Sequence, residues 1–322
     1  MKNIRSIIWI KKEDRLLQGL SLTGILPVLP TPFRGDGAVD LPAMERVVDF
    51  ALACGAKGLV FPGFASEVDD LTADERATLL RTVVARVAGR VPVIAGASAP
   101  SAEEAIAHSR DAVAAGVTTV MIQAPKSVGV GAEAVGAFYR TIAEAVPEIS
   151  IVLQNAPAPR GSDLNAETIH AIVAGNPSIT YVKEETLPSG PPISAILKGK
   201  PAHLKGVIGG GGARYIIDEY QRGACAAMPA VEITDVHVAL DRAFRAGDVA
   251  KARELYMRTL PLLVIQANYR MRFTKHVLCR RGIMDNDVVR AKLLTFDDYD
   301  VAEIDAWLDL VRDLLTVEGA HV

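Results

Sequence analysis

The sequence has little of what disulfide-rich or zinc-binding proteins need. Its three cysteines, Cys54, Cys225 and Cys279, lie far apart and form no CxxC spacing. Disulfide frameworks and zinc sites use closely spaced cysteines, so we expect neither of them here. None of the six histidines pairs at metal-ligand spacing, and we expect no metal site. Reduced thiols favour a cytoplasmic location.

The sequence also lacks a basic stripe and a long apolar run. The formal net charge is −3, which makes nucleic acid and anionic membrane surfaces unlikely partners. No run reaches the ~18 residues of a membrane span. The apolar residues 6–10 are followed at once by charged residues 11–15, so a secretory signal is not expected. We interpret residues 1–22 as an extension outside the fold.

From Gly24 onward, short apolar runs alternate with longer amphipathic segments. The runs are residues 25–29, 58–62, 92–97, 118–123, 150–154, 179–183, 204–208 and 225–228. Helical spacing marks residues 41–54, 73–87, 102–115, 133–145, 166–174, 192–197 and 214–222 between them. Thr72 with Glu75, and Ser101 with Glu104, predict capped helix starts. Further helices are predicted at 235–246, 249–267, 271–281 and 302–315.

Apolar strands separated by helices predict a parallel sheet covered by helices. Eight such units predict a closed (β/α)8 TIM barrel, because the first strand ends in Pro30-Thr31-Pro32-Phe33 and not in a phosphate-binding glycine pattern. No linker divides the chain. We therefore expect one domain, with the barrel at 23–248 and a C-terminal helical extension packed on it at 249–322.

Active sites of such barrels lie at the C-terminal ends of the strands, and Lys183 ends the sixth predicted strand. A lysine in the apolar run 179–183 is costly if it is buried and charged, whereas burial favours a neutral amine that can attack a carbonyl. The alternative is a lysine just past the strand whose ammonium reaches solvent. Position alone leaves both readings open.

Two turns at strand ends could bind a ligand. The second strand ends in Gly63-Phe64-Ala65-Ser66-Glu67, where backbone N–H groups and the Ser66 hydroxyl can meet an anion. The seventh runs into the glycines that begin at Gly209, which allow close backbone approach to a ligand or only a tight turn. The acidic runs 67–70 and 297–300 are interpreted as solvated faces.

Taken together, these features resemble the dihydrodipicolinate synthase/N-acetylneuraminate lyase family of Schiff-base barrels. They are Gly24-Ile25-Leu26-Pro27-Val28 with Thr31-Pro32-Phe33, Gly63-x-x-x-Glu67, Asn155-x-Pro157 and Val182-Lys183-Glu184. The resemblance implies that Lys183 forms the imine. It also implies that the substrate carboxylate meets Ala65 and Ser66, and that Asn155 and Gly209 help to bind the substrate.

Departures from the family pattern point to one branch. Gln154 stands where carbon–carbon bond-forming members place a tyrosine, and Lys126-Ser127 replaces an aromatic pair. Gln154-Asn155, Ser66-Glu67, Lys183-x-Glu185-Thr186 and Thr274-Lys275 are more similar to the sugar-acid dehydratase branch, whose model substrate is 2-keto-3-deoxyarabonate.

The expected chemistry is a hydro-lyase reaction on a small 2-keto acid through an imine on Lys183. It needs no organic cofactor, because the protein's own amine is the electron sink. Gln154 cannot titrate at neutral pH and would orient the substrate or a water. Ser66 would bind the carboxylate or relay a proton. Glu185 would polarise Gln154 or Ser66.

Two alternatives stay open at this point. One is a pyruvate-dependent aldolase or synthase that uses the same lysine, and the other is a non-catalytic ligand-binding member of the family. The resemblance also implies a homo-oligomer, with a tetramer expected. The apolar segment 260–265 in the extension agrees with this expectation.

Overall fold

Eight parallel strands form one closed sheet in the computed structural model, which describes residues 21–158 and 160–319. Their order is β1-β8-β7-β6-β5-β4-β3-β2. A parallel bridge between Val28 and Val60 joins the two ends of this series. The Leu29 N–H donates to the Val60 carbonyl at 3.0 Å across the same seam. The predicted (β/α)8 barrel is confirmed.

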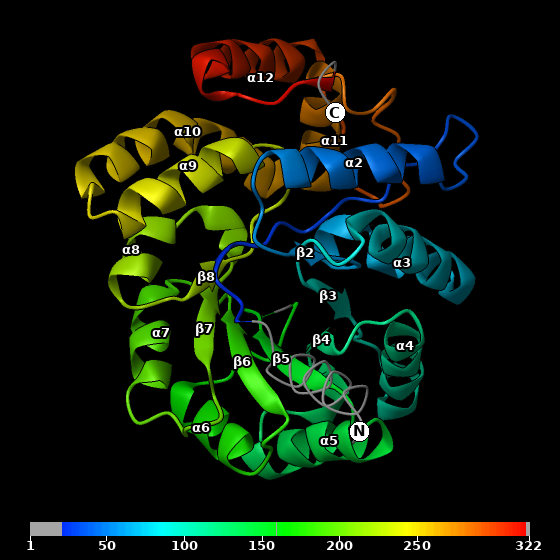
Figure 1. Cartoon of the computed structure of the whole chain (residues 1–322), viewed down its shortest axis with the longest axis vertical. Helices are drawn as coiled ribbons and strands as arrows, with labels where there is room; N and C mark the ends of the chain where they lie inside the picture. Colours follow the sequence, from blue (N-terminus) through cyan, green and yellow to red (C-terminus); the bar gives the residue numbers. More distant parts are fainter. Residues whose placement is uncertain (1–20, 159, 320–322) are drawn as a thin grey trace, which may run out of the picture.

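Helices surround this ring, and the C-terminal extension lies against one side of it (Figure 1). The strands are β1 Gly24–Ile25, β2 Leu59–Val60, β3 Val93–Gly96, β4 Thr119–Ile122, β5 Ser150–Asn155, β6 Ile179–Glu184, β7 Gly206–Gly209 and β8 Ala226–Ala227. The barrel helices are α2 Leu41–Ala53, α3 Ala73–Val87, α4 Ala102–Ala114, α5 Ala132–Ala145, α6 Ala166–Ala174, α7 Gly190–Leu197, α8 Ile216–Gln221 and α9 Thr234–Arg245. The extension contains α10 Val249–Tyr269, α11 Met271–Arg280 and α12 Asp298–Leu310.

Side chains alternate across the barrel wall, as they must in any strand. Inside the barrel, Val152 of β5 and Tyr181 of β6 pack in one buried cluster. Val182, one residue further along β6, belongs to the cluster between strands and helices. The same alternation turns Lys183 inward, where Gln154 is its register partner on β5. The alternation thus places a lysine and an amide side by side at the C-terminal ends of two strands.

The opposite end of the barrel is filled by Leu22. Its side chain is 1% exposed and belongs to the inner cluster, and its N–H donates to the Tyr181 hydroxyl at 3.0 Å. The predicted extension 1–22 lies outside the described residues up to residue 20. Leu22 itself is part of the fold, because an apolar side chain is needed to fill this end of the barrel.

Helix starts follow the predicted capping signals. Thr72 and Glu75 form a capping box at the start of α3, and the Ser101 hydroxyl accepts from the Glu104 N–H at the start of α4. The last helix was predicted to begin at residue 302, but α12 begins at Asp298. The Asp297 carboxylate accepts from the Tyr299 and Asp300 N–H groups, so the acidic run 297–300 is a helix cap.

A buried ion pair holds the extension to the barrel. The Arg281 guanidinium lies 2.6 Å from the Asp235 carboxylate of α9, and both side chains are at most 3% exposed. Arg281 also donates to the Glu232 carbonyl at 2.8 Å, and Asp235 accepts from the Thr316 N–H at 2.7 Å. Three separate segments of the chain therefore meet at this pair.

Gly209 is required for packing at the end of β7. A Cβ at this position would collide with the buried carboxyl of Glu219 from α8. The Ser189 hydroxyl donates to Glu219 Oε1 at 2.7 Å, while Oε2 has no hydrogen-bond partner within the described residues. Burial raises the pKa of Glu219 to about 7. The glycine makes room for a carboxyl that keeps its proton up to about pH 7.

We expect Arg281→Met to lower the free energy of unfolding by about 3–5 kcal/mol, because it leaves Asp235 as a buried, unpaired charge. Arg280→Met is the matched control. It removes the neighbouring arginine, which pairs with Asp305 at the surface, and should cost about 0–1 kcal/mol. Urea unfolding at pH 7 measures both. Equal midpoints for the two variants would contradict the role given to the buried pair.

We expect Glu219→Gln to stabilise the protein only above the ordinary carboxyl pKa of 4.5. Between pH 4.5 and 7 the folded state keeps a proton on Glu219 that the unfolded state has lost, so wild-type stability falls as the pH rises. Glutamine removes this loss. The gain over wild type should grow from near zero at pH 4.5 to about 3 kcal/mol above pH 7. Glu133→Gln, at an exposed position of α5, should show no such rise in denaturation curves.

Candidate active site at the C-terminal ends of the strands

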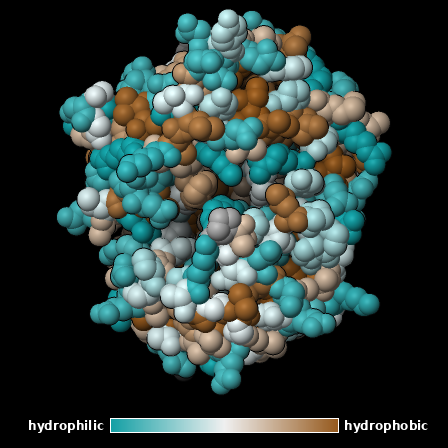
Figure 2. All heavy atoms as spheres, turned by 180° about the vertical axis from the view of Figure 1, so that it is seen from behind, coloured by the Kyte–Doolittle hydropathy of each residue, from teal (hydrophilic) through white to brown (hydrophobic). Residues whose placement is uncertain are grey.

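A cavity of about 240 Å³ opens at the C-terminal ends of the strands. The face of the molecule seen in Figure 2 is hollowed near its centre. The residues that line the cavity include Val28, Phe64, Ala65, Met121, Arg160, Lys183, Glu185, Arg214, Gln266 and Arg270. They come from barrel strands, from the loops that follow those strands and from the C-terminal extension. The cavity is thus a joint product of the barrel and its extension.

Lys183 lies in this cavity beside a buried carboxylate. Its side chain is 7% exposed, and its Nζ is 2.7 Å from Glu185 Oε1. Gln154 Nε2 donates to the same oxygen at 2.7 Å, and Arg160 pairs with Glu185 Oε2. Burial by itself would raise the pKa of Glu185, but the charges of Lys183 and Arg160 outweigh it and lower that pKa to about 2. Glu185 is therefore ionised at neutral pH.

Gln154 lies at the boundary between this cavity and a second one. The second cavity, of about 550 Å³, includes Gln154 in its lining and shares Phe64, Met121 and Arg160 with the first. No tyrosine lines either cavity within the described part of the chain. A tyrosine proton relay at this position is therefore missing from both the sequence and the geometry.

Asn155 and Glu184 point to the other side of the barrel wall. They are register partners on β5 and β6, and Asn155 Nδ2 donates to Glu184 Oε2 at 2.9 Å. Asn155 also accepts from the Leu164 N–H and donates to the Leu164 carbonyl, both at 2.9 Å. Neither side chain lines the cavity. Direct binding of substrate by Asn155 stays a prediction, and the geometry shows it holding the loop after β5.

The turn after β2 contributes Ala65 to the cavity but turns Ser66 away from it. The Ser66 hydroxyl donates to the Leu29 carbonyl at 2.5 Å and accepts from the Gly63 N–H at 2.9 Å. The Ser66 N–H donates to the Gly63 carbonyl at 2.9 Å. Both donors of Ser66 are occupied within the protein. The catalytic role predicted for Ser66 stays a prediction, whereas its observed contacts close the turn.

Glu67 corrects the interpretation of run 67–70 as a solvated face. Its side chain is fully buried, and its Oε1 lies 2.5 Å from Lys275 Nζ of α11. Its other oxygen accepts from the Arg290 and Ala291 N–H groups at 2.7 and 2.8 Å. Burial lowers the pKa of Lys275 to about 8. Only a distant segment supplies these partners, so the run by itself could not reveal them.

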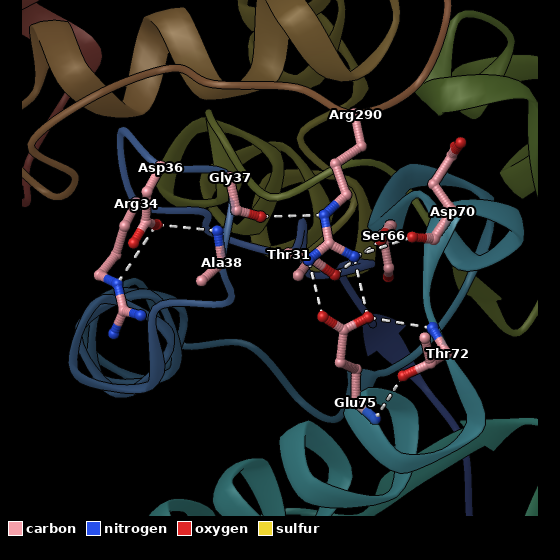
Figure 3. Close-up of polar contacts among 10 residues, drawn as sticks. All are labelled: Thr31, Arg34, Asp36, Gly37, Ala38, Ser66, Asp70, Thr72, Glu75 and Arg290. Carbon is pink, nitrogen blue, oxygen red and sulfur yellow. Dashed lines mark hydrogen bonds and ion pairs between the residues drawn. The ribbon is translucent and has the colours of Figure 1, made fainter.

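Arg290 adds a second contact between the extension and the turns after β1 and β2 (Figure 3). Its guanidinium reaches the Glu75 carboxylate at 2.6 and 2.8 Å and the Gly37 carbonyl at 3.0 Å. From the segment after β1, the Thr31 hydroxyl donates to the Ser66 carbonyl at 2.6 Å. The turn that carries Ala65 is therefore held from the barrel and from the extension.

Four of the predicted site residues line the two cavities, namely Lys183, Gln154, Ala65 and Glu185. The sequence-based prediction did not include the three arginines that also line the first cavity, Arg160, Arg214 and Arg270. Arg160 and Arg214 lie in loops that follow strands, and a search of all C-terminal strand ends for charged residues could have found them. Arg270 lies at a helix junction in the extension, for which no local signal exists. Within the described residues, no group of side chains is placed to hold a metal ion.

The chain matches the family model described as the Dihydrodipicolinate synthetase family over residues 21–309. The 4-hydroxy-tetrahydrodipicolinate synthase of Acidobacterium capsulatum is 31% identical over 260 residues, which are 78% of this chain and 82% of that protein. A probable 2-dehydro-3-deoxy-D-pentonate aldolase of Escherichia coli, YjhH, is 30% identical over 259 residues, 76% and 82% of the two chains. The match to the synthase of Xanthomonas axonopodis pv. citri is 39% identical but spans only 54% of that protein.

Solved structures give the same result. A dihydrodipicolinate synthase of Rhodopseudomonas palustris superposes with a TM-score of 0.84 at 26% identity, over 90% of this chain and 97% of that one. YagE of E. coli, solved in complex with pyruvate, has a TM-score of 0.83 at 25% identity and covers 91% and 99%. Among the helices that the structure describes, none has both the length and the apolar character to cross a membrane. The chain belongs to the dihydrodipicolinate synthetase family, whose members are lyases.

Proposed function

We propose that the protein is a Schiff-base lyase that dehydrates a 2-keto-3-deoxy sugar acid, with Lys183 as the imine-forming residue. The observation that carries this proposal is the contact of Lys183 Nζ with the ionised Glu185 carboxylate, 2.7 Å away inside the cavity. A carboxylate with a pKa of about 2 is too weak a base to take the proton of an ammonium group, so Glu185 acts through its charge. It holds the Lys183 nitrogen in place and stabilises the positive charge of the protonated imine.

The chemistry follows from the imine. Neutral Lys183 adds to the C2 ketone, and loss of one water gives a protonated imine that withdraws electrons from C3. Removal of a C3 proton gives an enamine, which expels the C4 hydroxyl as water. After tautomerisation, hydrolysis consumes one water and frees Lys183. The net change is loss of one water from the substrate, and no organic cofactor is needed because the imine is the electron sink.

Glu185 is suited to position the reacting nitrogen and to stabilise its positive charge in these steps. It lies beside the reacting nitrogen, and Gln154 and Arg160 hold its two oxygens in place. Gln154 keeps one hydrogen-bonding atom, its Oε1, free to meet a substrate hydroxyl or a water. The branch assignment rests on the absence of tyrosine at this position. A carbon–carbon bond-forming member would use that tyrosine as its proton relay.

An aldolase reaction on the same imine is the second candidate, and one observation favours it. YjhH, which is 30% identical, carries the name of a probable 2-dehydro-3-deoxy-D-pentonate aldolase. The two reactions share every step up to the imine and differ in whether the C3–C4 bond or the C4–O bond breaks. Products identify the reaction: pyruvate indicates cleavage, and a 2,5-dioxo acid indicates dehydration. A non-catalytic member would give neither product.

Borohydride should trap one covalent adduct on Lys183 with pyruvate or with 2-keto-3-deoxyarabonate, because reduction fixes the imine. Intact mass and peptide mapping measure it. Lys183→Ala should lose both the adduct and turnover, whereas Lys126→Ala, an exposed lysine of the β4–α5 loop, should keep them. An adduct on Lys126, or none with any 2-keto acid, would contradict the assignment.

Gln154→Tyr and Gln154→Ala should both lower kcat/KM for a 2-keto-3-deoxypentonate. Each removes the hydrogen bond from Gln154 to Glu185, and a lost buried hydrogen bond costs about 1–3 kcal/mol, or roughly one to two decades in rate. Gln221→Ala, on the exposed end of α8, is the control. If both Gln154 variants keep the wild-type kcat/KM, this residue only lines the cavity and takes no part in the reaction. Pyruvate aldolase activity in Gln154→Tyr would instead show that the position selects the reaction.

A further inference from the structure

The cavity carries more positive charge than a simple 2-keto acid can balance. Three arginines line it together with Lys183, and Glu185 is the one carboxylate among the lining residues that the structure describes. When Lys183 is the neutral amine needed for attack, the remaining side chains leave a net charge of about +2. The carboxylate of the keto acid neutralises one of these charges. One positive charge of the lining side chains is then left without a negative counterpart.

Arg214 is built into the wall of the cavity. It follows the glycine run after β7, and Gly212, with φ +68°, leaves room for it: a Cβ there would lie 3.1 Å from Arg214 Nη1. The Tyr256 hydroxyl donates to the Arg214 carbonyl at 2.5 Å and fixes its backbone. Gln266 lies 3.5 Å from the guanidinium. Within residues 21–158 and 160–319, no carboxylate pairs with Arg214.

Arg270 lines the same cavity, at the junction of α10 and α11. It has φ 54° and ψ −125°, a strained backbone conformation for a residue with a side chain. Its guanidinium lies 5.8 Å from the centre of the Phe64 ring, and that of Arg160 lies 5.0 Å from the same ring. Arg270 also has no carboxylate partner in the described part of the chain. Burial and the charge of Arg160 both lower the pKa of Arg270.

Arg214 and Arg270 therefore lie close enough to repel each other, and Glu185 is the one carboxylate near them in the described part of the chain. Burial lowers the pKa of Arg214, and the charge of Arg270 lowers it further. Such an arrangement is unfavourable in the empty protein, because two partly desolvated like charges raise each other's energy. An anion bound between them would remove this penalty. Arginine forks are suited to bidentate contacts with carboxylate and phosphate.

We propose that Arg214 and Arg270 bind a second anionic group, a carboxylate or a phosphate, at the end of the 2-keto acid remote from the ketone. This inference rests on the proposed function, because the imine on Lys183 determines which end of the substrate faces the arginines. Among 2-keto-3-deoxy acids, the protein then prefers a dianionic one over one, such as 2-keto-3-deoxyarabonate, that ends in a neutral CH₂OH group.

The test compares pairs of 2-keto acids that have the same chain length and differ only in the terminal group. The pairs are 2-oxoglutarate with 2-oxopentanoate, 2-oxoadipate with 2-oxohexanoate, and 2-keto-3-deoxy-6-phosphogluconate with 2-keto-3-deoxygluconate. For each acid, borohydride trapping on Lys183 gives the concentration for half-maximal adduct. Pyruvate is measured beside them. The proteins are the wild type, Arg214→Gln, Arg270→Gln and, as a control, Arg253→Gln on the exposed face of α10.

In the wild type, the dianion of at least one pair should reach half-maximal adduct at about ten-fold lower concentration than its monoanionic partner. Arg214→Gln and Arg270→Gln should abolish this preference, and Arg253→Gln should keep it. Preference in the two dicarboxylate pairs alone identifies a terminal carboxylate, and preference in the phosphate pair alone identifies a phosphate.

Two outcomes overturn the inference. One is equal trapping of dianions and monoanions by the wild type while pyruvate still forms its adduct. The other is a preference that both arginine variants retain. Absence of any adduct, pyruvate included, would instead overturn the proposed function together with the inference that rests on it.

Discussion

Glu185 has its two carboxylate oxygens surrounded by Lys183, Gln154 and Arg160, and the rest of the site is arranged around this contact. The carboxylate is buried, and burial alone would make it neutral. Two cations keep it ionised, and a buried carboxylate that is ionised binds its partners strongly because little water screens the charge. The contact therefore fixes the nitrogen of Lys183, the amide of Gln154 and the loop that carries Arg160 relative to one another.

The C-terminal extension is part of the site and not an addition to it. Lys275 reaches Glu67 in the turn after β2, and Arg290 holds the same region through Glu75. Gln266 and Arg270 line the cavity itself. A barrel supplies strand ends and short loops, but these leave the mouth open on one side. The extension adds the charge of Arg270 to the cavity beside Phe64, a residue of the turn after β2.

Much of this could be predicted from local pattern. The alternation of apolar runs and amphipathic segments predicted the barrel, and the family motifs singled out Lys183, which the structure places in the cavity. Predictions failed where one residue's environment depends on a distant segment. Glu67 reads as one of several surface acids, yet Lys275 and the backbone at Arg290 bury it. The Ser66 hydroxyl donates a hydrogen bond to the Leu29 carbonyl, a contact that the sequence does not reveal, and its catalytic role stays a prediction. Asn155 falls on the outer side of the wall by its register.

The sequence by itself determined the strand and helix order, the inward direction of Lys183 and Gln154, and the family. Each of these follows from periodicity or from motifs within a few residues of one another. Tertiary structure alone decided which polar groups face the cavity, which are hydrogen-bonded to neighbouring backbone, and that Arg214 and Arg270 both line it. Hydrogen bonds and desolvation act over a few ångströms in space, and residues more than fifty positions apart in the chain come within that range only when the barrel closes and the extension packs against it.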